Sequence, residues 1–298
     1  MKIVQSFWSK PMLVNDNSDA IFRSNGGWVN RIFFYMSWAL SCLKFKDIYK
    51  NVELVTDRYG KHLLCDILEL PFSNVIIELD NLNEYDHNLW ALGKLYAYKI
   101  QKEPFIHVDS DVFVWRKFSD KILESELIGQ NYEKNYKCNV DYFNQIRNLL
   151  DYIPAEMEDE IYLTNDIIQV NAGILGGNNL SFFNDYVKNA FDMVDKNTDL
   201  FRRNPFNKGA FNMVYEQFLF YCMAKSRQCN INVLFEGNYL NHVGLADFEY
   251  IPSNKYYAHT LGTYKKFSYI GGYIAERLLF EYPEYYNKIV SFYNKNYI

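Results

Sequence analysis

Short apolar runs and longer amphipathic segments follow one another over the first 115 residues of the chain. Apolar runs rich in β-branched residues predict strands, whereas apolar residues that recur every three or four positions predict helices. The predicted strands cover residues 2–8, 52–56, 74–79 and 104–108, and the predicted helices cover residues 27–46, 60–67 and 88–101. Strands that alternate with helices indicate βαβ units, so we expect an α/β fold in which helices flank a mixed, mainly parallel sheet.

The pattern changes after residue 115. The next segment is more polar and is rich in Asn, Glu and Tyr. From there on the pattern predicts a helix around 140–152, a strand broken by glycines at 167–177, helices at about 180–196 and 209–226, and a tyrosine-rich tail of helix and loop from residue 256. No repeat, low-complexity tract or Pro/Gly linker interrupts the sequence, so we expect a single domain over residues 1–298, with functional halves at 1–115 and 116–298.

The composition is that of a globular protein and excludes two functional classes. Hydrophobic residues make up 49% of the 298 positions and charged residues 22%, which is enough for a substantial core. The net charge of −5 and the lack of Lys/Arg runs argue against nucleic-acid binding. No apolar run reaches the roughly 20 residues of a membrane-spanning helix. The five cysteines lack metal-type spacing and indicate reduced thiols, so we expect a cytoplasmic protein.

The most specific polar motif is an Asp-Ser-Asp turn between two apolar strands. Side chains two positions apart on extended chain point to the same side, so Asp109 and Asp111 can converge on one cation. Two carboxylates favour Mg²⁺ or Mn²⁺, which keep open positions for phosphates. Ligands of open α/β sheets bind beyond the carboxyl ends of the strands. For this motif alone, a charged turn without a ligand is the alternative.

Other polar residues follow the carboxyl ends of predicted strands. Right-handed crossovers place these ends at one rim of a parallel sheet, so we expect Ser6, Trp8 and Asp57 at the same rim. Asp57 can contact a nucleoside there, or it can cap the helix that follows.

Three later segments carry polar residues that complement the acidic pair. An H-x-x-G-x-x-K loop runs from His259 to Lys265. An imidazole is a competent Mn²⁺ ligand, and a lysine supplies a positive charge for a diphosphate. Asn171 ends an apolar strand and can bond sugar hydroxyls. Glu216 and Gln217 lie on a predicted helix. The alternatives are a structural histidine, a turn asparagine and a solvated helix face.

The order of these motifs resembles that of the GT-A glycosyltransferases, most closely glycosyltransferase family 8. The resemblance covers roughly residues 90–265 by motif order and the first 115 residues by topology. The sequence departs from the family where Lys266 and Phe267 replace a usual Pro-Trp, where Gln5-Ser6-Phe7-Trp8 replaces an acidic strand, and where Glu216 replaces a usual Asp.

This resemblance implies a GT-A fold, which is a Rossmann-like nucleotide-diphospho-sugar transferase. It implies that the first half binds the nucleotide, and that the second half, with its helical tail, binds the acceptor and the donor sugar. The implied site residues are Asp109, Asp111 and His259 as ligands of Mn²⁺ or Mg²⁺; Ser6, Trp8, Asp57, Lys94, Asn171 and Lys265 as contacts of the nucleotide sugar; and Glu216 and Gln217 as catalytic candidates. Lys94 is included because a basic residue precedes the acidic pair at a similar distance in that family; it shares a predicted helix face with Trp90 and Tyr98.

The implied function is metal-dependent transfer of a sugar from a nucleotide-diphosphate sugar, UDP-linked, to a glycan or other hydroxyl acceptor. The resemblance suggests retention of configuration, and Glu216 keeps an inverting mechanism open. A cytoplasmic enzyme can reach a lipid-linked acceptor at the inner surface of the membrane. The alternative is a carbohydrate-binding protein without turnover. A nucleotidyltransferase is disfavoured because no G-x-G-T-R loop follows the first strand, and a haloacid-dehalogenase-type phosphatase because Phe113 stands where Thr or Val is usual.

Overall fold

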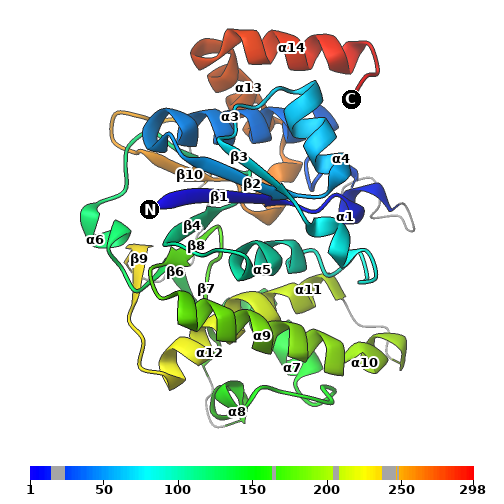
Figure 1. Ribbon diagram of the computed structural model, residues 1–298, viewed down its shortest axis with the longest axis vertical. Helices are drawn as coiled ribbons and strands as arrows, with labels where there is room; N and C mark the ends of the chain where they lie inside the picture. Colours follow the sequence, from blue (N-terminus) through cyan, green and yellow to red (C-terminus); the bar gives the residue numbers. More distant parts are fainter. Residues whose placement is uncertain (15–23, 163–165, 204–207, 237–245, 247) are drawn as a thin grey trace. The chain divides into compact units, whose positions relative to one another are not determined.

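The computed structural model describes residues 1–14, 24–162, 166–203, 208–236, 246 and 248–298 (Figure 1). The chain forms two compact units that are interleaved in sequence. The terminal unit comprises residues 2–87, 108–117 and 241–298, and the middle unit comprises residues 88–107 and 118–240. The single-domain organisation stays a prediction.

The terminal unit contains a parallel sheet and a separate antiparallel pair. Strands β1 (Lys2–Phe7), β2 (Val52–Thr56) and β3 (Asn74–Ile77) pair in parallel in the order β3-β2-β1. All of β2 is buried, as its run of Val, Leu and Thr predicts. Strands β5 (Val112–Val114) and β10 (Tyr257–His259) form the antiparallel pair, which joins two segments far apart in sequence.

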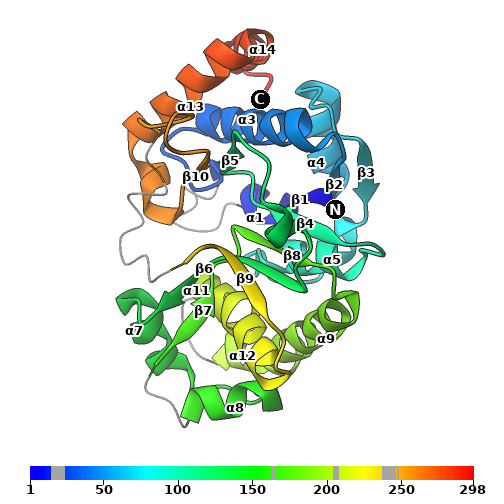
Figure 2. The ribbon, with the colours of Figure 1, turned by 90° about the vertical axis from the view of Figure 1, so that its left-hand side faces the viewer.

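Helix α3 (Arg31–Tyr49) is the central helix of the terminal unit. Its first turn is capped by Asn30, whose side chain accepts a hydrogen bond from the Ile32 backbone N–H at 3.0 Å. The helix therefore begins four residues later than the sequence pattern predicts, and Trp28 precedes it. Nearly every residue from Phe34 to Phe45 is buried, so the helix is covered on almost all sides. Helices α13 (Ser268–Glu281) and α14 (Pro283–Asn294) pack against it (Figure 2).

Short helical elements connect the strands of the terminal unit. They are α1 (Lys10–Leu13), α4 (Arg58–Lys61), the π-helix η1 (His62–Ile67), and the 3₁₀-helices η2 (Leu79–Leu82) and η5 (Gly262–Lys266).

The middle unit is built on a second group of strands. They are β4 (Phe105–Val108, its last residue in the terminal unit), β6 (Leu127–Lys134), β7 (Ile168–Val170), β8 (Ile174–Gly177) and β9 (Ile231–Phe235). The order is β4-β8-β6-β7, and β9 pairs with β6 in parallel, while β7 and β8 are antiparallel to β6. A Cβ at Gly176 would lie 2.2 Å from the Phe105 carbonyl oxygen, so glycine is required where β8 passes β4.

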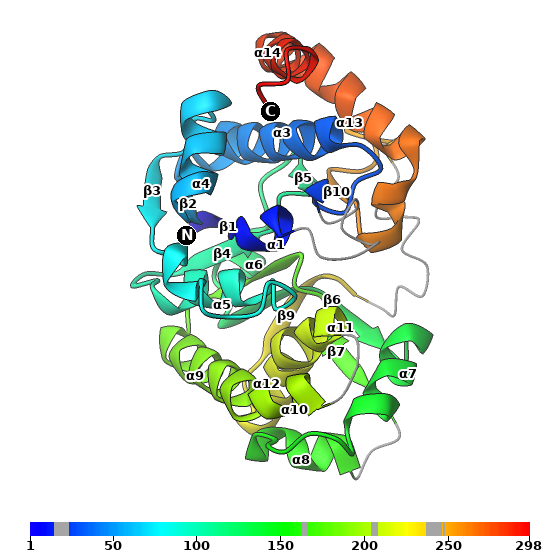
Figure 3. The same cartoon turned by 90° about the vertical axis from the view of Figure 1, so that its right-hand side faces the viewer.

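Helices cover the strands of the middle unit (Figure 3). They are α5 (Leu92–Lys99), α6 (Asp120–Leu123), α7 (Lys137–Ile146), α8 (Ala155–Tyr162), α9 (Leu180–Lys196), α10 (Thr198–Arg203), α11 (Lys208–Met213), the π-helix η3 (Val214–Phe218) and α12 (Leu219–Ser226). Aromatic rings pack between α5, α9 and α12: the Tyr98 and Phe183 ring centroids lie 6.0 Å apart, and those of Tyr186 and Phe220 lie 5.4 Å apart. Such aromatic pairs bury large apolar areas.

The predicted fold class is confirmed: the fold is mixed α/β, with a mainly parallel sheet flanked by helices. Three strands were missing from the prediction, namely β6, β9 and β10. The helix predicted at 209–226 is present as three consecutive helical elements. Within the described residues, no helix combines the length and the apolar character that crossing a membrane requires. Cys42, Cys65, Cys222 and Cys229 are free thiols, as the sequence predicts.

Candidate functional site

The Asp-Ser-Asp turn lies between β4 and β5, and hydrogen bonds from its own backbone and from α3 fix its shape. The Val112 backbone N–H donates to the Asp109 carbonyl at 3.1 Å, which closes the turn. On α3, the Ser37 hydroxyl donates to the Ser110 carbonyl at 2.8 Å, and the Ser41 hydroxyl donates to the Val112 carbonyl at 2.7 Å. Backbone carbonyls that water would otherwise solvate are thereby satisfied inside the fold.

The hydroxyl of Ser41 is itself held by β1. The Gln5 side-chain amide donates to the Ser41 oxygen at 2.9 Å, and Gln5 is fully buried. This support was not predicted, although Ser37 and Ser41, four positions apart on an otherwise apolar helix, share one face and could have indicated it.

The register of the β5–β10 pair brings His259 to the turn. His259 lies opposite Val112, the residue that follows Asp111. The next backbone N–H, that of Thr260, donates to the Asp111 carbonyl at 3.0 Å. Since both strands are buried, their pairing fixes the position of the imidazole relative to the backbone of Asp111.

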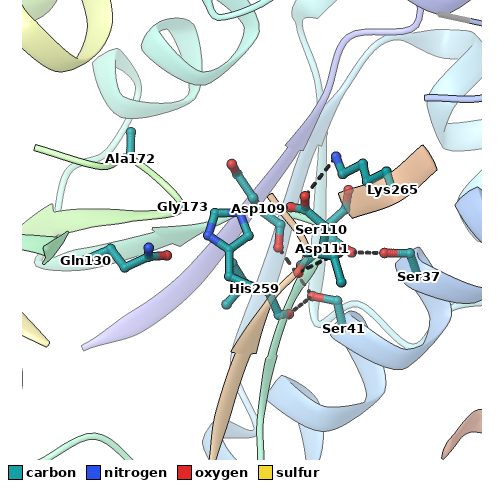
Figure 4. A network of polar contacts seen from close by, with 12 residues as sticks. Ser37, Ser41, Asp109, Ser110, Asp111, Gln130, Ala172, Gly173, His259 and Lys265 are labelled. Atoms are coloured by element: carbon teal, nitrogen blue, oxygen red, sulfur yellow. Dashed lines mark hydrogen bonds and ion pairs between the residues drawn. The ribbon is translucent and has the colours of Figure 1, made fainter. Parts of the chain in front are cut away.

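The side chains of Asp109, Asp111 and His259 converge (Figure 4). Their potential ligand atoms all lie within 4.8 Å of one another. Asp111 is 4% exposed and His259 is 2% exposed, and the distance from His259 Nε2 to Asp111 Oδ1 is 3.5 Å. Two carboxylates and one imidazole are a fitting donor set for Mn²⁺ or Mg²⁺.

Lys265 completes this group of charges. Its ammonium nitrogen lies 2.7 Å from Asp111 Oδ2. Burial alone would raise the pKa of Asp111, but the positive charge of Lys265 and the neighbouring His259 outweigh it and hold the pKa well below its usual range. Asp111 is therefore a carboxylate at neutral pH, as a metal ligand must be.

The backbone of Lys265 is anchored. The Val29 backbone N–H donates to its carbonyl at 2.9 Å. Its ammonium lies 5.8 Å from the Trp28 ring centroid, within the range of a cation–π interaction. Gly262, earlier in the same loop, has a φ of +39°, a left-handed conformation that favours glycine.

The predicted rim residues of β1 and β2 belong to the terminal unit as well. Asp57 is 3% exposed and caps α4: its carboxylate accepts from the Gly60 N–H at 2.7 Å and from the N–H and hydroxyl of Ser9 at 2.6 and 2.8 Å. The capping alternative is confirmed, and nucleoside contact stays a prediction. Trp8 is buried, and no described residue accepts a hydrogen bond from its indole N–H.

The remaining predicted residues, Lys94, Asn171, Glu216 and Gln217, belong to the middle unit. There, the buried carboxylate of Glu133 on β6 organises a network of side-chain amides. It accepts from Asn171 Nδ2 at 2.7 Å and from Gln169 Nε2 at 2.6 Å, and more weakly from Asn139 at 3.5 Å. Asn171 Oδ1 accepts from the Gly173 N–H at 2.9 Å. Glu133 and Gln169 were not foreseen, because β6 was not predicted.

This network fixes the orientation of the Gln217 amide. A carboxylate only accepts, so the Gln169 atom beside Glu133 is its nitrogen. The same nitrogen lies 2.8 Å from Gln217, and the Gln217 atom facing it is therefore the oxygen. The nitrogen of Gln217 remains to donate, and no described residue accepts a hydrogen bond from it. A ligand atom in contact with the Gln217 side chain would therefore face an N–H donor.

Glu216 is fully buried in the π-helix η3. Its carboxylate lies 3.2 Å from the Lys94 ammonium, which also lies 5.5 Å from the Trp90 ring centroid and 3.4 Å from the Ala172 carbonyl. The alternative of a solvated helix face is wrong for Glu216. The helix is covered on nearly all sides here, since Gln217 alone among residues 214–220 is partly exposed.

Comparison with protein families gives one match over nearly the whole chain. The model of DUF6734, described as a family of unknown function, matches residues 1–292. The chain belongs to DUF6734. No curated protein matches the sequence. The function of this DUF6734 member therefore has to be inferred from its residues.

Solved structures similar to this DUF6734 member are glycosyltransferases. Mouse xyloside xylosyltransferase 1, in its apo form, is 13% identical with a TM-score of 0.40, and the alignment covers 78% of this chain and 84% of the mouse chain. The galactosyltransferase LgtC in complex with donor and acceptor sugar analogues is 11% identical with a TM-score of 0.37, over 72% of this chain and 70% of LgtC. An active-site mutant of LgtC gives the same values.

Proposed function

We propose that this DUF6734 member is a metal-dependent glycosyltransferase of the GT-A type, related to glycosyltransferase family 8. It would transfer a sugar from a UDP-sugar to a hydroxyl group of a glycan or other acceptor, with retention of configuration. The observation that carries the proposal is the convergence of Asp109, Asp111 and His259, with Lys265 at 2.7 Å from Asp111. The order of motifs along the chain supports the same reaction class.

In this proposal, the buried turn and the β5–β10 pair prepare the site before any ligand arrives. Asp109, Asp111 and His259 would hold Mn²⁺ or Mg²⁺. When bound, this metal supplies Lewis-acid stabilisation of the negative charge on the departing diphosphate. Lys265 would add a positive charge to the same group, and its effect is large because the surrounding side chains exclude water. The serines of α3 keep the two aspartates in place through the turn backbone.

The donor sugar is assigned to polar residues of the middle unit. Gln217 would donate to a sugar oxygen, because its own oxygen is bonded to Gln169. Glu216 is fully buried and paired with Lys94, which favours a positioning role over that of a catalytic base. With no base assigned, retention, in which the diphosphate itself helps to remove the acceptor proton, is the mechanism we propose.

The test is calorimetric titration with UDP and then GDP, each with and without Mn²⁺. We compare wild type with Asp111→Asn and with Asp195→Asn, an exposed aspartate on α9 that serves as the matched control. We expect binding of one nucleotide that depends on Mn²⁺, is lost in Asp111→Asn and is unchanged in Asp195→Asn.

The opposite result has a definite meaning. If neither nucleotide binds under any metal condition, the transferase proposal is wrong. Binding of a glycan array that needs neither metal nor nucleotide would then favour the carbohydrate-binding alternative.

A further inference from the structure

The carboxylate of Asp111 is engaged on both of its oxygens. Oδ2 lies 2.7 Å from the Lys265 ammonium, and Oδ1 lies 3.5 Å from His259 Nε2. The side chain of Asp111 is only 6% exposed, so water contributes little to balancing its charge. A buried carboxylate needs such a positive partner, since an isolated charge in a protein interior is strongly unfavourable.

A divalent cation and the ammonium group of Lys265 would compete for the negative charge of this carboxylate. The ligand atoms of Asp109, Asp111 and His259 span no more than 4.8 Å, so a cation held by all three would lie within a few ångströms of the Lys265 nitrogen. The repulsion between a charge of two and a charge of one at such a distance is severe where few water molecules screen it.

We propose that Lys265 is the resident counter-cation of Asp111 and that it exchanges with the divalent metal. The ammonium holds the carboxylate while no metal is bound, and it leaves when the metal arrives. The released ammonium is then free for the diphosphate of the nucleotide. This inference rests on the proposed function for the identity of that second partner, whereas the exchange itself concerns only the metal and Lys265.

The surroundings of Lys265 allow its head group to move while its backbone stays fixed. The bond from the Val29 N–H holds its carbonyl at 2.9 Å. The stem passes Gly27, where an added Cβ would lie 3.5 Å from Lys265 Cδ, and the side chain is 20% exposed. Rotation about the side-chain bonds of a lysine is sufficient to carry the ammonium away from Asp111.

The exchange has two consequences. Lys265 lowers the affinity of the site for metal alone, because the metal must displace it. It also links metal binding to nucleotide binding, because each metal ion that binds releases a positive charge that a diphosphate can use. A lysine that only contacted the diphosphate would produce neither competition with the metal nor a cost to metal binding.

The experiment is titration with Mn²⁺ alone, with free Mn²⁺ followed by its electron paramagnetic resonance signal. We compare wild type with Lys265→Met, with Lys265→Arg, which keeps the charge, and with Lys266→Met, which removes the same charge one residue away. We expect Lys265→Met to bind Mn²⁺ at least about tenfold more tightly than wild type. Lys266→Met and Lys265→Arg should stay within about twofold of wild type.

Calorimetric titration with UDP provides the second readout. In wild type, Mn²⁺ should strengthen UDP binding by a larger factor than in Lys265→Met, because only wild type releases an ammonium group. If Lys265→Met is unstable without metal, Lys265→Gln replaces it in both titrations.

Two outcomes overturn the inference in distinguishable ways. If Lys265→Met binds Mn²⁺ as wild type does or more weakly, the exchange is wrong, while the metal site and the proposed function stand. If no variant binds Mn²⁺ with or without UDP, the metal site itself is wrong and the proposed function fails with it.

Discussion

The two units each bury a carboxylate, and they balance its charge in different ways. Asp111 in the terminal unit is 4% exposed and faces the ammonium of Lys265 and the imidazole of His259. Glu133 in the middle unit is 5% exposed, and its partners among the described residues are side-chain amides, chiefly those of Asn171 and Gln169. A cationic partner can be exchanged for another cation, whereas amide donors hold their acceptor in one geometry. The cationic partners of Asp111 suit a site that takes up a metal, whereas the amide partners of Glu133 suit a part of the fold that has to stay rigid.

The largest effect is expected at another buried carboxylate of the middle unit, Glu216. Lys94→Met removes its cationic partner and should lower the free energy of unfolding by about 3–5 kcal/mol, the cost of an uncompensated buried charge. Urea denaturation measures it. The double variant Lys94→Met/Glu216→Gln should recover most of the loss, because no charge is left buried. A loss below about 1 kcal/mol in the single variant would contradict the assigned ion pair.

Replacing Glu133 tests whether the amide network only stabilises the fold and has no part in metal binding. Glu133→Ala leaves the side-chain amides of Asn171 and Gln169 without their acceptor, and it should lower the free energy of unfolding by about 3 kcal/mol. Mn²⁺ affinity should stay as in wild type, whereas Asp111→Asn should abolish it. Denaturation and Mn²⁺ titration on both variants give the comparison. If Glu133→Ala weakens Mn²⁺ binding as strongly as Asp111→Asn does, the two regions are not separate in function.

The two regions also differ in how far the sequence reveals them. Asp109 and Asp111 follow a buried strand, and the pattern of strand, acidic turn and strand is visible in the residues themselves. The approach of His259 depends on its pairing with Val112 across more than a hundred residues, and only the resemblance to a family suggested it. Lys265 was expected at a diphosphate, and its pairing with Asp111 was not expected.

The amide network was harder to foresee, because it depends on β6. This strand includes Gly129, which has no side chain, and the polar residues Gln130 and Asn131; together they hide the alternation typical of a strand. Without β6, Glu133 has no predicted neighbour, and the roles of Gln169 and Asn171 cannot be assigned. The burial of Glu216 was missed because an apolar stripe predicts one buried face, whereas this helix is buried on nearly all sides.

A smaller effect is expected at the serines that hold the Asp-Ser-Asp turn. Ser41→Ala removes the 2.7 Å bond to the Val112 carbonyl and leaves the Gln5 amide without its acceptor. We expect a loss of about 1–2 kcal/mol in the free energy of unfolding and Mn²⁺ binding weakened by several-fold. Ser268→Ala, at an exposed serine of α13, is the control and should change neither quantity. Unchanged Mn²⁺ affinity in Ser41→Ala would show that the turn keeps its shape without the α3 serines.

The smallest effect concerns His107, the buried histidine of the middle unit. Burial, and secondly the positive charge of Lys94, hold the pKa of His107 well below its ordinary value. The unfolded chain takes up a proton near pH 6.5 and the folded chain does not, so the unfolded state binds more protons and stability falls as the pH falls. Between pH 7 and pH 6, this difference amounts to about 0.7 kcal/mol for one histidine.

His107→Gln removes the titrating group and should reduce the pH dependence of the unfolding free energy by that amount. Urea denaturation of both proteins at the two pH values measures it, and the difference between the proteins cancels the contribution of the other histidines. Equal slopes would mean that His107 takes up a proton in the folded protein. The cost of burying the imidazolium, which is the larger of the two causes, would then be offset by contacts that favour the protonated ring.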